Sequence, residues 1–362
     1  MMRNACLIIT DKSGFLDLSK FSAFCAFAHS GYDFSEIRLL RFDVDVIKTA
    51  IQDCKKNAEV IVVLADGFVF DLIKTVEAAY GKKLLQNAES GAGVIDDGEK
   101  TLFLLPAQDE NYVKDICVPL LVHKIGYRIG SIVMRCVGVD GAKMQDLLAK
   151  VESMGVGRVK VCNESKYGED VVRIFYDENT PRMLTDDILR FLADALKDNV
   201  YALDDTPLEK QLVDLLRLRR KKLAVAESFT GGGLAKKIVS VSGASDVYYE
   251  GLNTYAEGSK MERLGVTEYT LRSQGAVSEQ TAYEMAAGLL SQGRCDVAIA
   301  TTGLSGPKGD SFGQPVGTCC IAVGIDQNVY VYRYLLQGDR QEISETAIRY
   351  ALFLACKQLK NM

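Results

Sequence analysis

Two glycine-rich turns, each directly after an apolar stretch, constrain the fold of this chain more than any other feature. The first is Ala226-Glu-Ser-Phe-Thr-Gly-Gly-Gly233, which follows a predicted strand over 223–226. The second is Thr301-Thr-Gly-Leu-Ser-Gly-Pro-Lys-Gly309, which follows a predicted strand over 296–300. Because α/β proteins build their sites at the carboxyl ends of sheet strands, we expect the two turns to face each other there.

Ser228 is the candidate functional residue of the first turn. A hydroxyl at this position lies beside unpaired N–H groups at a helix start, which favours an anion or a developing oxyanion. For the motif alone, a capping serine in an ordinary turn is the alternative. The two histidines, His29 and His123, both lie in the N-terminal third. A Ser-His-Asp triad built within this region is therefore excluded, and lysine is the usual substitute as a base.

Composition narrows the class of protein. A chain of 362 residues exceeds one ordinary domain. A hydrophobic content of 48% with 25% charged residues is typical of a folded, soluble protein. The net charge of −5 argues against non-specific nucleic-acid binding. No apolar run reaches the length of a membrane span, and the first residues do not read as a signal peptide. We therefore expect a cytoplasmic protein that binds neither membranes nor nucleic acid.

The ten cysteines are scattered without a C-x-x-C pair, mostly inside apolar strands or helices. Only Cys25 and His29 have a spacing that would put two ligands on one helix face, and one such pair cannot complete a tetrahedral zinc site. We expect buried free thiols in a reducing compartment and no structural metal.

The pattern of apolar segments divides the chain into three sections. Residues 1–125 alternate strands and helices, which predicts an α/β domain with a mostly parallel sheet. Residues 126–203 predict a compact α+β module in the order β-α-β-β-α. Residues 204–362 begin at a polar segment and predict a second α/β domain. Its predicted strands cover 223–226, 247–255, 297–301, 318–323 and 329–335, and its last helix covers 340–359.

Lys260, in Asn253-Thr-Tyr-Ala-Glu-Gly-Ser-Lys260, is the candidate base. A serine nucleophile needs a base that is neutral at working pH, whereas an ordinary lysine is protonated. A catalytic lysine must therefore be desolvated or lie near other positive charge, because both lower its pKa. Taken alone, Lys260 is more often a surface residue, and Tyr255 is an ordinary aromatic at a strand end.

Five ordered motifs lie between about 207 and 360. They are Ala226-Glu-Ser-Phe-Thr-Gly-Gly232; Tyr255 with Lys260 five residues later; Gly275-Ala-Val-Ser-Glu279; Thr302-Gly-Leu-Ser-Gly-Pro307 with Gln314-Pro-Val-Gly-Thr318; and Gly338-Asp-Arg340. In this order they closely resemble the C-terminal domain of the CinA (competence/damage-inducible) family. Members of that family act as nicotinamide mononucleotide deamidases that use a serine/lysine pair.

The resemblance implies a role for each matched residue. Ser228 would attack the substrate carboxamide, and Lys260 would take its proton and later serve the leaving ammonia. Tyr255 would position the pair or share in proton transfer. Backbone N–H groups in the two turns would stabilise the oxyanion or contact the substrate, and a guanidinium would bind the nucleotide phosphate. The implied substrate-binding residues are Thr230, Gly231, Gly232, Thr302, Gly303, Gly306 and Arg340.

Several positions depart from the family pattern. Phe229 replaces a cysteine beside the nucleophile and would narrow the pocket. The segment 256–259 differs throughout, and its Glu257 would raise the pKa of Lys260 and oppose its role as a base. Asp310 replaces a glycine and adds negative charge near a site expected to bind phosphate.

The first two sections follow the family's plan of a molybdopterin-cofactor-binding-like domain and a small KH-like linker domain. The first resembles its counterpart only in degenerate form, because Asp11-Lys-Ser-Gly-Phe15, Ala65-Asp-Gly-Phe-Val-Phe-Asp71 and Pro106-Ala-Gln-Asp-Glu110 replace the family's functional loops. We expect the ADP-ribose pyrophosphatase activity known in the family to be absent, and this domain to be structural, dimer-forming or regulatory. Gly138-Val-Asp-Gly141, nominally a KH loop, predicts an ordinary strand-to-helix turn.

The sequence thus predicts a cytoplasmic homodimer without cofactor or metal, whose C-terminal domain deamidates nicotinamide mononucleotide to nicotinate mononucleotide in pyridine nucleotide recycling. Two alternatives stay open. An amidohydrolase acting on a related carboxamide is motivated by the altered segment 256–259. A nucleotide-binding regulatory protein with vestigial activity is motivated by the loss already seen in the first domain.

Overall fold

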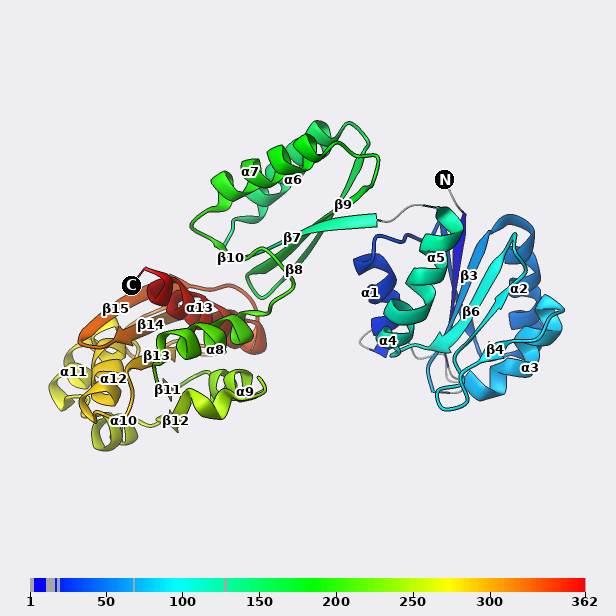
Figure 1. The fold of residues 1–362 in the computed structure, drawn as a ribbon. Helices are drawn as coiled ribbons and strands as arrows, with labels where there is room; N and C mark the ends of the chain where they lie inside the picture. The colour runs from blue at the N-terminus through cyan, green and yellow to red at the C-terminus, as the bar shows by residue number, and fades with distance from the viewer. Residues whose placement is uncertain (1–2, 11–16, 18–19, 68, 127–128, 362) are drawn as a thin grey trace. The chain divides into compact units, whose positions relative to one another are not determined.

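Figure 1 shows the computed structural model of the chain, which describes residues 3–10, 17, 20–67, 69–126 and 129–361. The chain divides into two compact units, Met1–Ser131 with Phe175–Thr180, and Ile132–Ile174 with Pro181–Met362. Most of the middle section of the sequence thus falls in the same unit as the C-terminal domain. The altered turn at 11–15 lies outside the described residues.

The N-terminal unit is built on a six-stranded sheet with the order β2-β1-β3-β6-β5-β4. The first four strands in this order are parallel, and β5 is antiparallel to both of its neighbours. The prediction of a mostly parallel sheet is confirmed. The strands are β1 (Asn4–Thr10), β2 (Glu36–Arg41), β3 (Val60–Ala65), β4 (Leu85–Gln86), β5 (Gly93–Asp96) and β6 (Thr101–Pro106).

Helices cover both faces of this sheet, because β1 and β3 are buried along their whole length. α2 and α3 pack on one face through side chains such as Ile51 and Leu72. α1 and α5 pack on the other through Phe27 and Leu121. The helices are α1 (Ser22–His29), α2 (Val44–Asn57), α3 (Val69–Tyr80), α4 (Glu110–Tyr112), a π-helical segment (Val113–Cys117) and α5 (Val118–Ile125).

The middle section forms a four-stranded sheet, in the order β10-β7-β9-β8, with α6 and α7 packed on it. The predicted order β-α-β-β-α is confirmed, and a three-residue strand, β10, follows it. The segment 138–141 leads from β7 into α6, where Asp140 caps the helix through its carboxylate, so this segment is a strand-to-helix turn. The elements are β7 (Ile129–Val137), α6 (Gly141–Gly155), β8 (Val159–Lys166), β9 (Glu169–Asp177), α7 (Arg182–Leu196) and β10 (Val200–Ala202).

The C-terminal domain contains a five-stranded sheet with the order β12-β11-β13-β14-β15. β12, β11 and β13 are parallel, and β14 and β15 are antiparallel to their neighbours. In the parallel part, Glu227 pairs with Asn253 on one side and Thr301 on the other. Three strand ends therefore meet at one edge of the sheet. The strands are β11 (Leu223–Glu227), β12 (Tyr248–Asn253), β13 (Val297–Gly303), β14 (Thr318–Ile325) and β15 (Asn328–Leu335).

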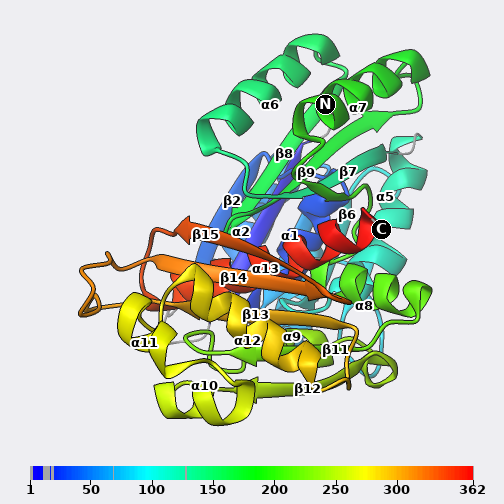
Figure 2. The same cartoon turned by 90° about the vertical axis from the view of Figure 1, so that its left-hand side faces the viewer.

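Helices lie on both faces of this second sheet (Figure 2). α8, α9 and α13 pack on one face through Leu212, Leu234 and Leu352. α10, α11 and α12 pack on the other through Leu264, Leu271 and Met285. The helices are α8 (Leu208–Arg219), α9 (Gly233–Val239), α10 (Glu257–Leu264), α11 (Glu268–Gln274), α12 (Glu279–Ser291) and α13 (Arg340–Lys360), with a 3₁₀ turn at Ala244–Asp246. Among the described residues, no helix has both the length and the apolar character needed to cross a membrane.

Candidate active site

Ser228 is held at the end of β11 by its own backbone and by the residue before it. Its N–H group donates to the Thr301 carbonyl at 3.0 Å, which extends the pairing of β11 with β13 by one residue. The Glu227 carboxylate is buried and accepts the N–H groups of Gly232, Leu234 and Ala235 at 3.0, 3.1 and 2.8 Å. These donors belong to the start of α9, where backbone N–H groups otherwise lack partners. Glu227 thus fixes the turn that presents Ser228.

Lys260 reaches Ser228 from α10. Its Nζ donates to Ser228 Oγ at 3.0 Å, to the Thr254 carbonyl at 2.7 Å and to the Tyr255 carbonyl at 3.1 Å. The lysine is only 1% exposed. The two carbonyls hold two of the three Nζ positions, so the third is directed at the serine hydroxyl.

Burial lowers the pKa of the Lys260 ammonium from 10.5 to about 8. The Glu257 carboxylate, on the first turn of the same helix, acts in the opposite direction and raises this pKa. The sequence-based concern about Glu257 is therefore right in direction, but desolvation outweighs it. Near neutral pH an appreciable fraction of Lys260 is neutral and able to accept a proton.

Tyr255 contributes to this arrangement through its main chain. Its carbonyl accepts from Lys260, whereas its side chain is 64% exposed and lies at the border of the pocket. No hydrogen bond joins its phenol to Ser228 or Lys260 among the described residues.

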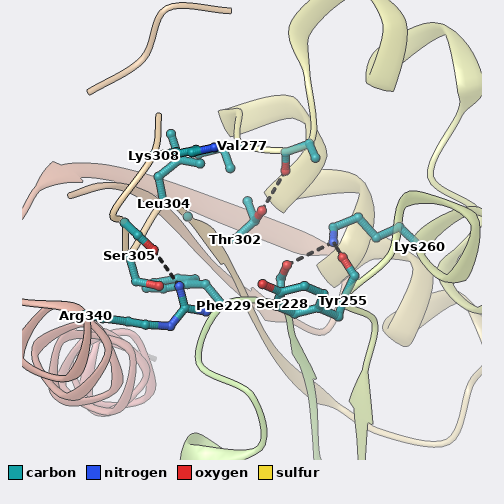
Figure 3. A pocket seen from close by; sticks show the side chains of 13 residues that line it. Ser228, Phe229, Tyr255, Lys260, Val277, Thr302, Leu304, Ser305, Lys308 and Arg340 are labelled. Atoms are coloured by element: carbon teal, nitrogen blue, oxygen red, sulfur yellow. Dashed lines mark hydrogen bonds between the residues drawn. The ribbon is translucent and has the colours of Figure 1, made fainter. Parts of the chain in front are cut away.

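The pair opens into a pocket of about 230 Å³ (Figure 3). Besides Ser228, Lys260 and Tyr255, its walls come from the turn after β11, the segment before α12, the loop after β13 and the start of α13. None of the lining side chains is acidic, and two at the loop side are cationic. These further lining residues are Phe229, Ala276, Val277, Thr302, Gly303, Leu304, Ser305, Gly306, Lys308 and Arg340.

Four of the residues predicted to bind substrate line this pocket, and each has a structural contact that fixes it. Thr302 Oγ1 donates to the Ala276 carbonyl at 2.6 Å, and an Arg340 guanidinium nitrogen donates to the Gly306 carbonyl at 2.6 Å. Gly303 packs against the Phe229 ring, where a Cβ would lie 2.9 Å from the nearest ring atom. Phe229 is buried and forms one wall of the pocket.

Thr230, Gly231 and Gly232, the other three predicted residues, lie outside the pocket lining. Gly231 donates its N–H to the Ser228 carbonyl at 3.1 Å, and the Gly232 N–H is accepted by Glu227. Thr230 Oγ1 bonds Thr301 Oγ1 at 2.8 Å. These residues shape the turn, and the N–H groups of both glycines are occupied.

Sequence reasoning missed Glu227, Thr254 and Lys308. Glu227 stands directly before the serine, and its type alone predicts a partner once its strand is known to be buried. Lys308 is part of the second glycine-rich turn, and its charge was the available signal. Thr254 acts through its carbonyl, which no residue type signals.

Asp310 and Asp66, two carboxylates considered as possible ligand contacts, each bond to groups of the protein. Asp310 Oδ1 accepts the N–H groups of Phe312 and Gln314, both at 3.0 Å, and Asp310 does not line the pocket. Asp66, after β3, forms an ion pair with Lys20 at 3.3 Å. Within the described part of the chain, no three His, Cys, Asp or Glu side chains are grouped so that they could hold a metal ion.

Fold and geometry together define an α/β protein whose C-terminal sheet carries a serine–lysine pair at its carboxyl edge. A family model described as the CinA C-terminal domain matches residues 205–359. A Thermoanaerobacter pseudethanolicus relative, named as a putative competence-damage inducible protein, is 31% identical over 287 residues, which cover 77% of this chain and 69% of the relative. A CinA-like protein of Thermotoga neapolitana is 32% identical over 283 residues, covering 78% and 69%. The chain belongs to the CinA family.

Solved structures were matched over parts of the chain. A CinA superfamily protein from Enterobacter cloacae is 36% identical and covers 44% of this chain and 96% of its own, with a TM-score of 0.42. The molybdopterin biosynthesis enzyme MoaB of Thermus thermophilus is 14% identical and covers 35% of this chain and 98% of its own, with a TM-score of 0.28.

Proposed function

We propose that the C-terminal domain is a serine–lysine amidohydrolase that converts nicotinamide mononucleotide to nicotinate mononucleotide and ammonia. The observation that carries this proposal is the 3.0 Å contact between Ser228 Oγ and the Nζ of a buried lysine with a lowered pKa. A nucleophile hydrogen-bonded to a base that is partly neutral near pH 7 is the requirement for acyl transfer.

In the first half of the proposed reaction, neutral Lys260 takes the proton from Ser228 as Oγ bonds to the carboxamide carbon. The carbonyl π electrons move to oxygen and form an oxyanion. The N–H group of Phe229, directly after the nucleophile, has no acceptor among the described residues and is our candidate donor to that oxyanion. The tetrahedral adduct collapses, the C–N bond breaks, and protonated Lys260 delivers its proton to the departing nitrogen as ammonia.

In the second half, Lys260 is again neutral and takes a proton from water, whose oxygen attacks the acyl carbon. Collapse breaks the bond to Ser228 Oγ, which regains the proton from Lys260, and the carboxylic acid product loses its remaining proton to solvent and leaves as the carboxylate. The two carbonyls of Thr254 and Tyr255 hold Lys260 Nζ beside Oγ through both halves. Tyr255 is thus proposed to position the pair through its main chain.

Ammonia release from nicotinamide mononucleotide tests the proposal, measured for the parent chain, Ser228→Ala and Lys260→Ala. We expect turnover in the parent, insensitive to chelator, and a loss of at least about 10³-fold in both variants. Ser240→Ala, at the exposed end of α9, is the matched control.

Turnover of another carboxamide but not of this nucleotide would favour the altered-substrate alternative. Binding of the nucleotide without turnover would favour the regulatory alternative. For the N-terminal unit we propose no ADP-ribose pyrophosphatase activity, since its loops lack the glycines and paired carboxylates that a phosphate-and-metal site needs. Hydrolysis of ADP-ribose by the parent chain with added Mg²⁺ or Mn²⁺ would contradict this.

A further inference from the structure

The two cationic side chains at the loop side of the pocket, Arg340 and Lys308, differ in their contacts. Both line the side of the pocket away from Lys260 (Figure 3). Arg340 donates to the Gly306 carbonyl at 2.6 Å, which ties the start of α13 to the loop after β13. Lys308 lies two residues further along that loop and is exposed; among the described residues it forms no ion pair or hydrogen bond. Lys308 therefore offers all three of its N–H donors to a ligand, whereas Arg340 has one N–H committed to the loop and keeps its charge and its other donors.

The acidic groups near this part of the fold are directed into their own turns. Asp310, the closest acid in sequence, accepts two backbone N–H groups of its own turn through Oδ1, and its Oδ2 is buried without a hydrogen-bond partner. Asp339 and Glu342, at the start of α13, form a reciprocal capping box at 2.9 and 2.8 Å. Since the pocket lining contains no acid, the positive charge of Lys308 is not neutralised from within the site.

The loop that carries Lys308 is fixed on both sides of it. Before Lys308, Arg340 holds the Gly306 carbonyl. After it, Gln314 Nε2 donates to the Val277 carbonyl at 2.6 Å, and Gln314 Oε1 accepts from Arg333 at 3.0 Å. The base of the loop is closed by the Leu304 N–H group, which donates to the Thr318 carbonyl at 2.9 Å. The backbone at Lys308 is thus preorganised, which lowers the entropy that a ligand must remove on binding.

One wall of the same pocket supplies an uncharged hydrogen-bonding group. Ser305 is 5% exposed and lines the pocket, and no partner takes its hydroxyl among the described residues. A hydroxyl on the pocket wall, close in sequence to an unpaired ammonium, favours a ligand group with several acceptor oxygens and negative charge. A phosphate monoester has these properties, and an uncharged ribose hydroxyl does not.

We propose that Lys308 selects a phosphate-bearing carboxamide, beside Arg340, which also fixes the loop. This inference rests on the proposed function, because it assigns a binding residue to the phosphate end of the substrate, opposite the carboxamide that reacts. It narrows the substrate class to carboxamide nucleotides over the corresponding nucleosides.

The test compares nicotinamide mononucleotide with nicotinamide riboside, which lacks only the phosphate, for the parent chain, Lys308→Met and Lys308→Arg. In Lys308→Met the ratio of kcat/KM for the nucleotide to that for the riboside should fall about tenfold, the loss expected for one charge-assisted contact at an exposed site. The change should lie in KM and shrink at 1 M salt, where the Debye length is about 3 Å. Lys308→Arg should restore most of the ratio.

Lys236→Met, an exposed lysine of α9 outside the pocket, is the control and should keep the parent ratio. An unchanged ratio in Lys308→Met, or an equal loss for both substrates, would overturn the proposal. Circular dichroism of each variant separates these outcomes from a folding defect, and Lys308→Arg provides a second folded variant.

Failure of the proposed function is distinguishable from failure of this inference. If the parent chain releases ammonia from neither substrate, the deamidase proposal fails, and Lys308 is then tested by calorimetric titration with nicotinamide mononucleotide and with inorganic phosphate. Binding by the parent that is at least about fivefold weaker in Lys308→Met supports the anion site. Equal binding by both proteins, or no binding by the parent, overturns it.

Discussion

The burial of Lys260 predicts how the stability of the C-terminal domain depends on pH. Its pKa is 10.5 in a solvated chain and about 8 in the folded protein. Between these values the unfolded chain holds a proton that the folded chain has released, so the free energy of unfolding rises with pH by about 1.4 kcal/mol per unit. As the pH falls through 8 the folded state becomes protonated as well, and it increasingly bears the cost of a buried ammonium. Integrated from pH 7 to pH 10, the gain is about 2.5 kcal/mol.

Lys260→Met removes the titrating group and keeps most of the side-chain volume. Urea unfolding of the parent and the variant at pH 7, 8.5 and 10 measures the difference in their unfolding free energies. If the chain unfolds in more than one transition, the difference is taken from the transition whose midpoint the substitution shifts. Tyrosines and cysteines titrate in both proteins, so their contributions cancel in the difference. We expect the stability of the parent relative to the variant to increase by about 2.5 kcal/mol from pH 7 to pH 10.

The control is Lys236→Met, whose lysine is exposed on α9 and should give no such pH dependence. A parent-to-variant difference that changes by less than about 0.5 kcal/mol over this range would refute the desolvation argument, since that is the usual error of such comparisons. A difference that falls with rising pH would reverse its sign and show that the folded state stabilises the ammonium.

The same geometry makes three further predictions. Activity (kcat/KM) should rise with pH with an apparent pKa near 8. Glu257→Gln should lower this apparent pKa, because the carboxylate raises the pKa of Lys260. An unchanged apparent pKa in the variant would contradict the assignment of Lys260 as the base. Glu227→Gln should lower the unfolding free energy by about 2–3 kcal/mol in urea and reduce activity in the folded fraction, because one amide oxygen cannot accept three N–H groups; full activity would show that the turn does not depend on this carboxylate. Gly303→Ala should cost about 1–3 kcal/mol in unfolding free energy, because its Cβ would lie 2.8 Å from Cys319 Cβ and 2.9 Å from the Phe229 ring. A double-mutant cycle with Phe229→Ala should recover only the part of the loss that comes from the ring.

The convergence of the two glycine-rich turns was predictable because it depends on strand pairing. β11 and β13 are parallel neighbours, and their register pairs Glu227 with Thr301, so the turns after them meet at one edge. Short apolar runs followed by glycines predict both the buried parallel strands and the turns at their carboxyl ends. The half-exposed edge strand β2 and the three-residue strand β10 were not among the predicted strands, because neither has a continuous apolar run.

The detailed roles within the turns could not be derived from residue types. The glycines after Ser228 looked like oxyanion donors, yet the Gly232 N–H bonds the Glu227 carboxylate, and that depends on how the Glu227 side chain folds back over α9. The size of the effect of Glu257 on the pKa of Lys260, relative to desolvation, could not be predicted from the sequence either. Its effect on the pKa of Lys260 had the expected sign, but only the packing of α10 shows that Lys260 is 1% exposed and that desolvation prevails.

The contacts of Lys260 connect its protonation state to the state of Ser228. A neutral lysine amine has two N–H donors and one lone pair, and the carbonyls of Thr254 and Tyr255 can only accept hydrogen bonds. Both donors therefore turn to the carbonyls, and the lone pair is left facing Ser228 Oγ at 3.0 Å. In the protonated form the third N–H occupies that direction and donates to Oγ, so the hydroxyl proton has no acceptor on Lys260. The two carbonyls thus make the serine reactive only when Lys260 is neutral. They also hold the Lys260 amine at the end of β12, beside Ser228 Oγ, where it can act as the base.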